Sequence, residues 1–317
     1  MNDHFDGTRF FLTGHTSSAR FRDLLKWQMN GRRSRWPKRV ANGDYPRPPQ
    51  RVEGSRLLAT WIGQATVLIQ TAGLNILTDP FFSPRASPFK YAGPRRARPP
   101  GVALQDLPPI DVILVSHNHY DHMDVPALAK LAQRGVVQVV TPLGNRRYMH
   151  KAMAGAAITE LDWHHSFALG AVRITLMPAL HWSKRRLSDA NTALWGAFVI
   201  DAGSGPIYFA GDTGFGEGNT FREVRERHGV PRLSLLPIGA YEPRWFMKSQ
   251  HMNPEEAVAA HQLLSSRTSI GIHHSTIQLT DEAIDAPVLA LRAAAAAAGL
   301  AGKAFLAPEA GEPREIA

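Results

Sequence analysis

A nine-residue stretch over 116–124, Ser-His-Asn-His-Tyr-Asp-His-Met-Asp, follows directly on the apolar run Val-Ile-Leu-Val. If that run is a buried strand, it must end in a loop crowded with metal-ligating groups. Residues two apart in an extended chain point to the same side, so His117 and His119 can reach one ion together. Asp121 and His122 follow where the chain turns towards a helical pattern, and they can reach a second ion. The stretch therefore favours a two-metal site over a histidine-rich surface loop.

The partners of this loop are expected at the ends of other strands, because two four-coordinate ions need more ligands than one loop provides. His181, Asp212 and His273 are each the first ligating side chain after an apolar, strand-like run. A lone histidine at such a place is usually structural, but three of them beside this loop favour a metal centre. The assignment gives one ion His117, His119 and His181, gives the other Asp121, His122 and His273, and lets Asp212 bridge them. A water between the ions would be hydroxide near neutral pH.

The composition limits the metal and the compartment. The 317 residues include no cysteine, so disulfides and thiolate ligands are excluded. Histidine and carboxylate ligands suit two Zn²⁺ ions, while Fe and Mn remain open. The chain has no apolar run of about 18 residues, so a membrane-spanning helix is not expected. Its first residues are acidic and polar, unlike a signal peptide, which together with the missing cysteines predicts the cytoplasm.

The charge predicts anionic partners. The net charge is +9 and the sequence pI is about 10.1. Eight Lys or Arg and a single acid, Asp23, lie between Arg20 and Arg39. One interpretation is a short basic amphipathic helix on an anionic membrane surface. The other is a basic arm that packs on the domain or is simply solvated, and the sequence leaves both open.

The alternation of elements predicts the fold. Apolar runs and turn residues divide the chain into a basic N-terminal arm with a linker (1–54) and a catalytic domain (55–317). Strands are expected at 57–62, 66–70, 75–78, 111–115, 136–140, 172–177, 195–201, 207–210, 233–238 and 269–272, and helices at 125–134, 145–154, 221–228, 254–265 and 289–298. Strand-rich beginnings of each half with interspersed helices predict an α/β (α+β) fold, an αββα sandwich of two mixed sheets flanked by helices.

Several motifs between about 57 and 276 resemble one protein family. They include Thr-Trp-Ile-Gly at 60–63, Leu-Thr-Asp-Pro at 77–80, the histidine loop, Gly-Asp-Thr-Gly at 211–214 and the run 237–247. On these motifs the chain resembles the N-acylphosphatidylethanolamine-hydrolysing phospholipase D branch of the metallo-β-lactamase superfamily. The long match over 237–247 separates this branch from β-lactamases, glyoxalases and RNA-processing relatives.

The resemblance implies a dinuclear-metal phosphodiesterase in which hydroxide attacks the phosphorus and releases phosphatidic acid and an N-acylethanolamine. It carries the same seven metal ligands, and it implies catalytic roles for Asp121, Asp212, Lys184 and Arg185. Tyr120, Gln250 and His251 are assigned to substrate contact. Where the group commonly has histidine this chain has Gln64, which is not expected to be a ligand.

The expected partners follow from charge and resemblance together. A phospholipid or another anionic phosphodiester is the expected substrate, with peripheral contact to the inner membrane surface and a homodimer as further expectations. Nucleic acid is not expected. Two alternatives remain open: another hydrolase of the same fold, such as a sugar-phosphate lactonase or a nuclease, and a non-catalytic member that binds anionic surfaces.

Overall fold

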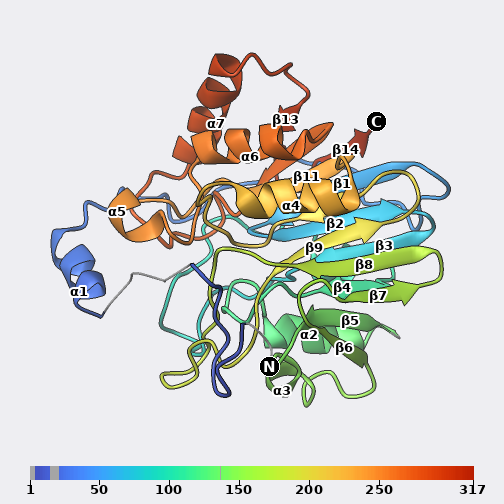
Figure 1. Cartoon of the computed structure of the whole chain (residues 1–317), viewed down its shortest axis with the longest axis horizontal. Coiled ribbons are helices and arrows are strands. Elements are labelled where there is room, and N and C mark those ends of the chain that lie inside the picture. Colours follow the sequence, from blue (N-terminus) through green and yellow to red (C-terminus); the bar gives the residue numbers. More distant parts are fainter. Residues whose placement is uncertain (1–3, 15–20, 136) are drawn as a thin grey trace.

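The computed structural model describes residues 4–14, 21–135 and 137–317. Two facing β-sheets are covered by helices on both outer faces (Figure 1), which confirms the predicted αββα sandwich. Arg20 and the first residue of the expected strand 136–140 lie outside the described residues. No helix in the described part of the chain is long and apolar enough to cross a membrane.

The first sheet is mixed. Within the described residues it has the order β14-β1-β2-β3-β4-β5-β6. The β1, β2 and β3 strands form an antiparallel meander, and β3 to β6 run parallel. Its strands are β1 (Leu57–Gly63), β2 (Thr66–Thr71), β3 (Leu74–Thr78), β4 (Val112–Leu114), β5 (Gln138–Pro142), β6 (Ala157–Leu161) and β14 (Pro313–Ile316).

The second sheet repeats this mixture in the order β13-β12-β11-β10-β9-β8-β7 among the described residues. The β7 to β10 strands are antiparallel, and β10 to β13 are parallel. Its strands are β7 (Ser166–Leu169), β8 (Val172–Met177), β9 (Ala197–Asp201), β10 (Ile207–Phe209), β11 (Leu233–Pro237), β12 (Thr268–Ile272) and β13 (Phe305–Leu306).

Apolar side chains fill three layers. The central layer joins the facing sides of the two sheets, as where Trp61 and Phe209 belong to one buried cluster. The outer face of the first sheet is covered by α2 (Val125–Ala132), beside α3 (Arg146–Met149). The outer face of the second sheet is covered by α4 (Asn219–His228), α6 (Pro254–Leu264) and α7 (Ala286–Ala297). Each helix therefore buries one face against a sheet, as an amphipathic pattern requires.

The N-terminal arm packs on the domain. Its helix α1 (Phe21–Asn30) lies beside α5 (Arg244–Met247) at one edge of the molecule (Figure 1). The Trp27 ring is buried and lies 5.2 Å from that of Phe246. Further along, the Trp36 indole donates to the carbonyl of Glu282 at 2.8 Å. The predicted basic helix therefore exists and its apolar side contacts the domain, while the division at residue 54 stays a prediction.

Some predicted elements differ from the structure. The expected helix over 145–154 is only the short α3, because the following residues continue as turns towards Gly155. The sequence prediction missed β6, β7, β13 and β14. These strands lie at or next to sheet edges and leave residues partly exposed, so their apolar pattern is weak.

Candidate metal centre

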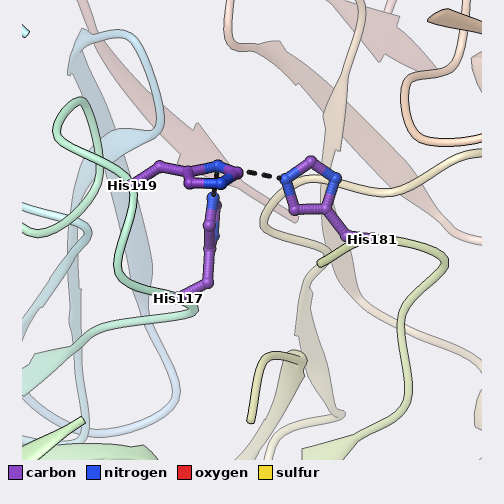
Figure 2. A group of neighbouring side chains, drawn as sticks. All are labelled: His117, His119 and His181. Atoms are coloured by element: carbon purple, nitrogen blue, oxygen red, sulfur yellow. Dashed lines mark hydrogen bonds between the residues drawn. The ribbon is translucent and has the colours of Figure 1, made fainter. Parts of the chain in front are cut away.

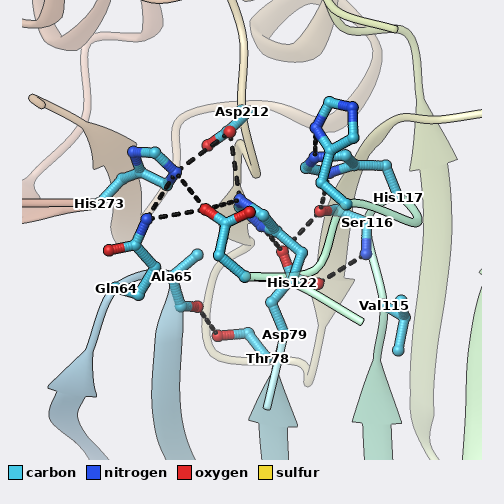
Figure 3. A network of polar contacts seen from close by, with 12 residues as sticks. Gln64, Ala65, Thr78, Asp79, Val115, Ser116, His117, His122, Asp212 and His273 are labelled. Carbon is cyan, nitrogen blue, oxygen red and sulfur yellow. Dashed lines mark hydrogen bonds and ion pairs between the residues drawn. The ribbon is translucent and has the colours of Figure 1, made fainter. Parts of the chain in front are cut away.

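The histidine loop is held by a carboxylate at the end of the neighbouring strand. Asp79 follows β3, which pairs with β4 in parallel, and its side chain is fully buried. Asp79 Oδ1 accepts the Ser116 backbone N–H at 2.7 Å, and Oδ2 accepts the Ser116 hydroxyl at 2.5 Å. The same Oδ2 lies 2.6 Å from His122 Nδ1 (Figure 3). This network fixes the start of the loop and directs His122 Nε2 away from Asp79.

Three imidazoles form the first cluster. Figure 2 shows His117, His119 and His181 converging from two different loops. His117 Nε2 lies 2.9 Å from His119 Nδ1, and His181 Nε2 lies 3.4 Å from the same atom. His181 Nδ1 donates to the carbonyl of Gln250 at 3.1 Å, which leaves Nε2 free to face the cluster. The predicted ligands of the first ion are therefore brought together.

The second cluster lies next to the first, with Asp212 between them. Asp121, His122 and His273 place their ligand atoms within 4.8 Å of one another. Asp212 Oδ2 lies 3.1 Å from His122 Nε2 and 3.2 Å from His273 Nε2. The same oxygen is 3.8 Å from His181 Nε2 in the first cluster. Asp212 thus has the position that a bridging carboxylate requires.

Burial and charge give the two clusters different protonation. Burial lowers the pKa of His119 to about 3 and that of His181 to about 4. At His273 burial acts in the same direction, but the carboxylates of Asp212 and Asp121 outweigh it and raise the pKa to about 9. Without metal at neutral pH, the first cluster is therefore uncharged, and the second holds imidazolium beside carboxylate.

The donor set fits a pair of transition-metal ions. His122 Nε2 and Asp212 Oδ1 are buried, and neither has a hydrogen-bond partner within the described residues. Such orphaned groups are rare unless something coordinates them. Nitrogen and carboxylate ligands in this number suit zinc, iron or manganese. Asp79 also lies close to two histidines, but its oxygens are already committed to Ser116 and His122, so it positions ligands and is not counted among them.

A cavity of about 520 Å³ opens onto both clusters. Three side chains that the sequence analysis placed near the substrate line it: Lys184, Gln250 and His251. Burial lowers the pKa of His251 well below its usual value, and His251 Nδ1 lies 3.9 Å from Asp212 Oδ2. The cavity wall also contains the apolar side chains Leu24, Trp182, Ala190, Phe246, Met247 and Leu279.

Arg185 and Tyr120 have a different place from the one expected. Neither is among the described residues that line the metal cavity. Arg185 Nη1 donates to the carbonyls of Asn118 and Met123 at 3.0 and 2.8 Å, and the guanidinium lies 4.2 Å from the Tyr120 ring centroid. The contact of Arg185 with a substrate phosphate stays a prediction, while in this structure its Nη1 holds the backbone of the histidine loop.

Sequence reasoning gave no role to two groups beside the metal-binding clusters. Asp79 was recognised only as part of a family motif. Gln64 has a φ of 53° and is buried, and its Nε2 lies 2.9 Å from both Asp121 Oδ2 and His273 Nε2. Its amide therefore contacts two ligands of the second cluster directly. The Gly-Gln turn after β1 was the available signal, because it brings a polar side chain to the same end of the sheet as the loop.

The fold and this centre define a metal-binding αββα protein with ligands from loops of both sheets. Residues 74–274 match the β-lactamase superfamily domain, so the chain belongs to that superfamily. The resemblance to the phospholipase D branch is confirmed by two relatives. One is N-acyl-phosphatidylethanolamine-hydrolyzing phospholipase D 1 of Caenorhabditis elegans, 44% identical over 70% of this chain and 65% of its own length.

The second relative is the mitochondrial N-acyl-phosphatidylethanolamine-hydrolyzing phospholipase D of Saccharomyces cerevisiae, 36% identical over 73% of this chain and 50% of its own length. The chain thus spans between half and two thirds of these relatives. Among solved structures, a possible metal-dependent hydrolase from Veillonella parvula has a TM-score of 0.66 at 16% identity, covering 82% of this chain and 99% of that one. That likeness concerns the fold.

Proposed function

We propose that this protein is a dinuclear-metal phosphodiesterase that cleaves a glycerophospholipid in the manner of a phospholipase D. The observation that carries the proposal is the mixed lining of the metal cavity. His119, Asp121, Asp212 and Lys184 line the same 520 Å³ space as Leu24, Phe246, Met247 and Leu279. A ligand that fills it must combine an anionic, metal-binding group with an apolar part, as a phospholipid does. The names of the two relatives support the same substrate class.

The ligand roles follow from the two clusters. His117, His119 and His181 would hold one ion, Asp121, His122 and His273 the other, and Asp212 both. Zn²⁺ is the proposed metal at both positions. When bound, such ions lower the pKa of water and stabilise negative charge on phosphate oxygens. In the cleavage, the oxygen of water forms a bond to phosphorus, the bond from phosphorus to the head-group oxygen breaks, and the departing alcohol gains a proton.

The protein's own side chains then divide the work of binding. Lys184 is a cation in the cavity wall, and its ammonium can compensate charge on the phosphate. His251 is uncharged at neutral pH because burial lowers its pKa, so it serves as a hydrogen-bonding group. Trp182 packs against His119 with ring centroids 4.6 Å apart, which restricts the rotation of that ligand.

Peripheral contact with the inner membrane surface is part of this proposal. Met29 of α1 is 82% exposed, and the neighbouring Trp245 is 53% exposed. The Lys26 ammonium lies 5.1 Å from the Trp245 ring centroid. Exposed apolar side chains beside cations are suited to an anionic lipid interface. Leu24 of the same helix lines the metal cavity, so a membrane lipid in contact with α1 would lie next to the wall of this cavity.

The chemistry is tested by metal analysis and a substrate panel. We expect two equivalents of metal per chain, and hydrolysis of N-acylphosphatidylethanolamine in preference to a sugar-phosphate lactone or a nucleotide phosphodiester. Asp212→Asn should reduce turnover at least a hundredfold, because the bridging position loses its charge. Wild-type turnover in this variant, or preference for the lactone or nucleotide, would exclude the proposal in this form.

The membrane contact is tested with Met29→Asp, compared with Leu289→Asp on α7, whose side chain is 55% exposed. Activity on anionic vesicles should fall for Met29→Asp and stay near wild type for Leu289→Asp. Both variants should hydrolyse a short-chain, monomeric substrate normally. Equal loss on vesicles in the two variants would show that the helix α1 has no special part in docking. Point variants are preferable to deletion of the arm, because Leu24 belongs to the cavity wall.

A further inference from the structure

A second cavity, of about 490 Å³, shares its wall with the histidine loop. Neighbouring residues of that loop divide between the two cavities. His119 and Asp121 line the metal cavity, while Tyr120 lines the second one. The segment after β8 divides in the same way, with Lys184 in the first cavity and Arg185 in the second. The two spaces are therefore neighbours with different linings.

The second cavity is lined by cations from several chain segments. They come from the loop after β3, from α3 and the turn that follows it, and from the segment after β8: Arg85, Arg147, Lys151, Arg185 and Arg186. Among the residues that the structure describes, none of the five has a carboxylate within ion-pairing distance. The five cations outnumber the one carboxylate of the lining, Asp124, so the cavity has a net positive charge that favours an anionic occupant.

The acids near the cavity are already engaged. Asp124 lines it, but its oxygens accept the backbone N–H groups of Phe82, Ser83 and Ala127 and the hydroxyl of Ser83. Asp189 accepts the backbone N–H groups of Arg185 and Arg186 and the Tyr148 hydroxyl. Both carboxylates therefore shape the walls and leave the guanidinium and ammonium groups available. The first turn of α2 is capped by Asp124, so the attraction of an anion falls to the side chains.

Two of the cations are held in place by contacts with uncharged groups, which do not neutralise the guanidinium charge. Arg185 stacks on Tyr120 and donates through Nη1 to loop carbonyls, which orient it without neutralising it. The Arg147 guanidinium lies 4.8 Å from the Tyr148 ring centroid and donates to the hydroxyls of Tyr148 and Thr192. Preorganised guanidinium groups bind phosphate oxygens well, because less rotamer freedom is lost on binding.

We propose that this cavity is a binding site for a phosphate monoester, separate from the metal centre. The cluster of Arg and Lys matches a dianionic phosphate better than a single carboxylate. The cavity is also larger than an inorganic ion needs, so an organic group of the size of a sugar or a lipid head group can accompany the phosphate. The proposal does not depend on the reaction at the metals. Its occupant would contact Tyr120 and Arg185, and hence the loop that carries four metal ligands.

The test is calorimetric titration of the full-length, metal-loaded protein with glycerol 3-phosphate. The variant Arg147→Gln with Lys151→Gln removes two exposed cations of the cavity. Its matched control, Arg225→Gln with Arg292→Gln, removes two exposed cations from α4 and α7. Binding of glycerol 3-phosphate at the metal centre should be equally strong in the cavity variant and in the control variant. The binding component assigned to the cavity should weaken at least tenfold in the first variant and stay at the wild-type value in the control.

Vesicles distinguish the source of the phosphate. Wild-type protein is mixed with phosphatidylcholine vesicles with and without phosphatidic acid, and sedimentation is compared for the same two variants. Loss of glycerol 3-phosphate binding in the cavity variant identifies a soluble ligand, and loss of binding to phosphatidic acid vesicles alone identifies a lipid head group. The proposal is overturned if the cavity variant binds both probes as the wild type does. It is also overturned if the control loses as much, because general charge attraction would then explain the binding.

Discussion

Asp79→Asn is the perturbation that best tests how the second cluster is built. The carboxylate of Asp79 accepts three hydrogen bonds, from Ser116 N, Ser116 Oγ and His122 Nδ1. An asparagine of the same shape keeps one acceptor oxygen, but its NH₂ group replaces the other. If that NH₂ faces His122, Nδ1 must give up its hydrogen and Nε2 must carry it. His122 Nε2, which lies 3.1 Å from Asp212 Oδ2, would then have no lone pair to offer a metal ion.

The expected effect is a 10- to 100-fold weaker affinity for the second ion, by the usual magnitude for the partner of a metal-ligating histidine. This corresponds to about 1.4–2.7 kcal/mol. The assay is competition with a chromophoric chelator, which resolves two dissociation constants. Ser116→Ala is the comparison, because Ser116 Oγ also lies 2.9 Å from His117 Nδ1 in the first cluster. Unchanged affinities in Asp79→Asn, or an equal loss at the second site in Ser116→Ala, would refute the reasoning.

Three further predictions concern protons, packing and capping. In metal-free protein the carboxylates raise the pKa of His273 to about 9 and the pKa of His122 well above its usual value. An ion must displace both protons, so second-site affinity should rise by more than tenfold per pH unit from pH 7 to 9. The metal affinity of the three-histidine site should not change with pH above pH 5, because the pKa values of His119 and His181 are about 3 and 4. Metal titrations at several pH values check the expectations for both sites. Phe209→Ala should lower the free energy of unfolding by about 3–5 kcal/mol in urea denaturation, since this fully buried ring lies between the sheets. Asn253→Ala should lower it by about 1 kcal/mol in the same assay, through loss of the capping box of α6.

The convergence of the candidate ligands was predictable because each follows an apolar strand. Parallel strands β10 and β12 carry Asp212 and His273 to the same edge of one sheet, and β4 carries the loop to the facing edge of the other. Strand ends are visible in sequence as a change from apolar to polar residues. The placement of these side chains therefore needed only the rule that such ends meet.

Side-chain direction in loops was not predictable in the same way. Lys184 and Arg185 are adjacent and alike in charge, yet they line different cavities. No periodicity governs irregular backbone, so the sequence could not separate them. The apolar face of α1 was visible as a pattern, but its contact between Trp27 and Phe246 joins residues more than two hundred positions apart. That contact depends on the tertiary fold.

The centre draws its ligands from loops of both sheets, at positions 117–122, 181, 212 and 273. Ions bound there would join chain segments separated by roughly 30 to 60 residues, and these ligands come together only in the folded chain, so metal binding favours the folded state. At a free metal concentration a thousandfold above the dissociation constant, each ion adds about 4 kcal/mol to the stability of the fold. The ions would therefore hold the two sheets of the sandwich together at this edge. After chelation, the ligand-bearing loops at this edge should unfold locally at a lower temperature than the apolar interior.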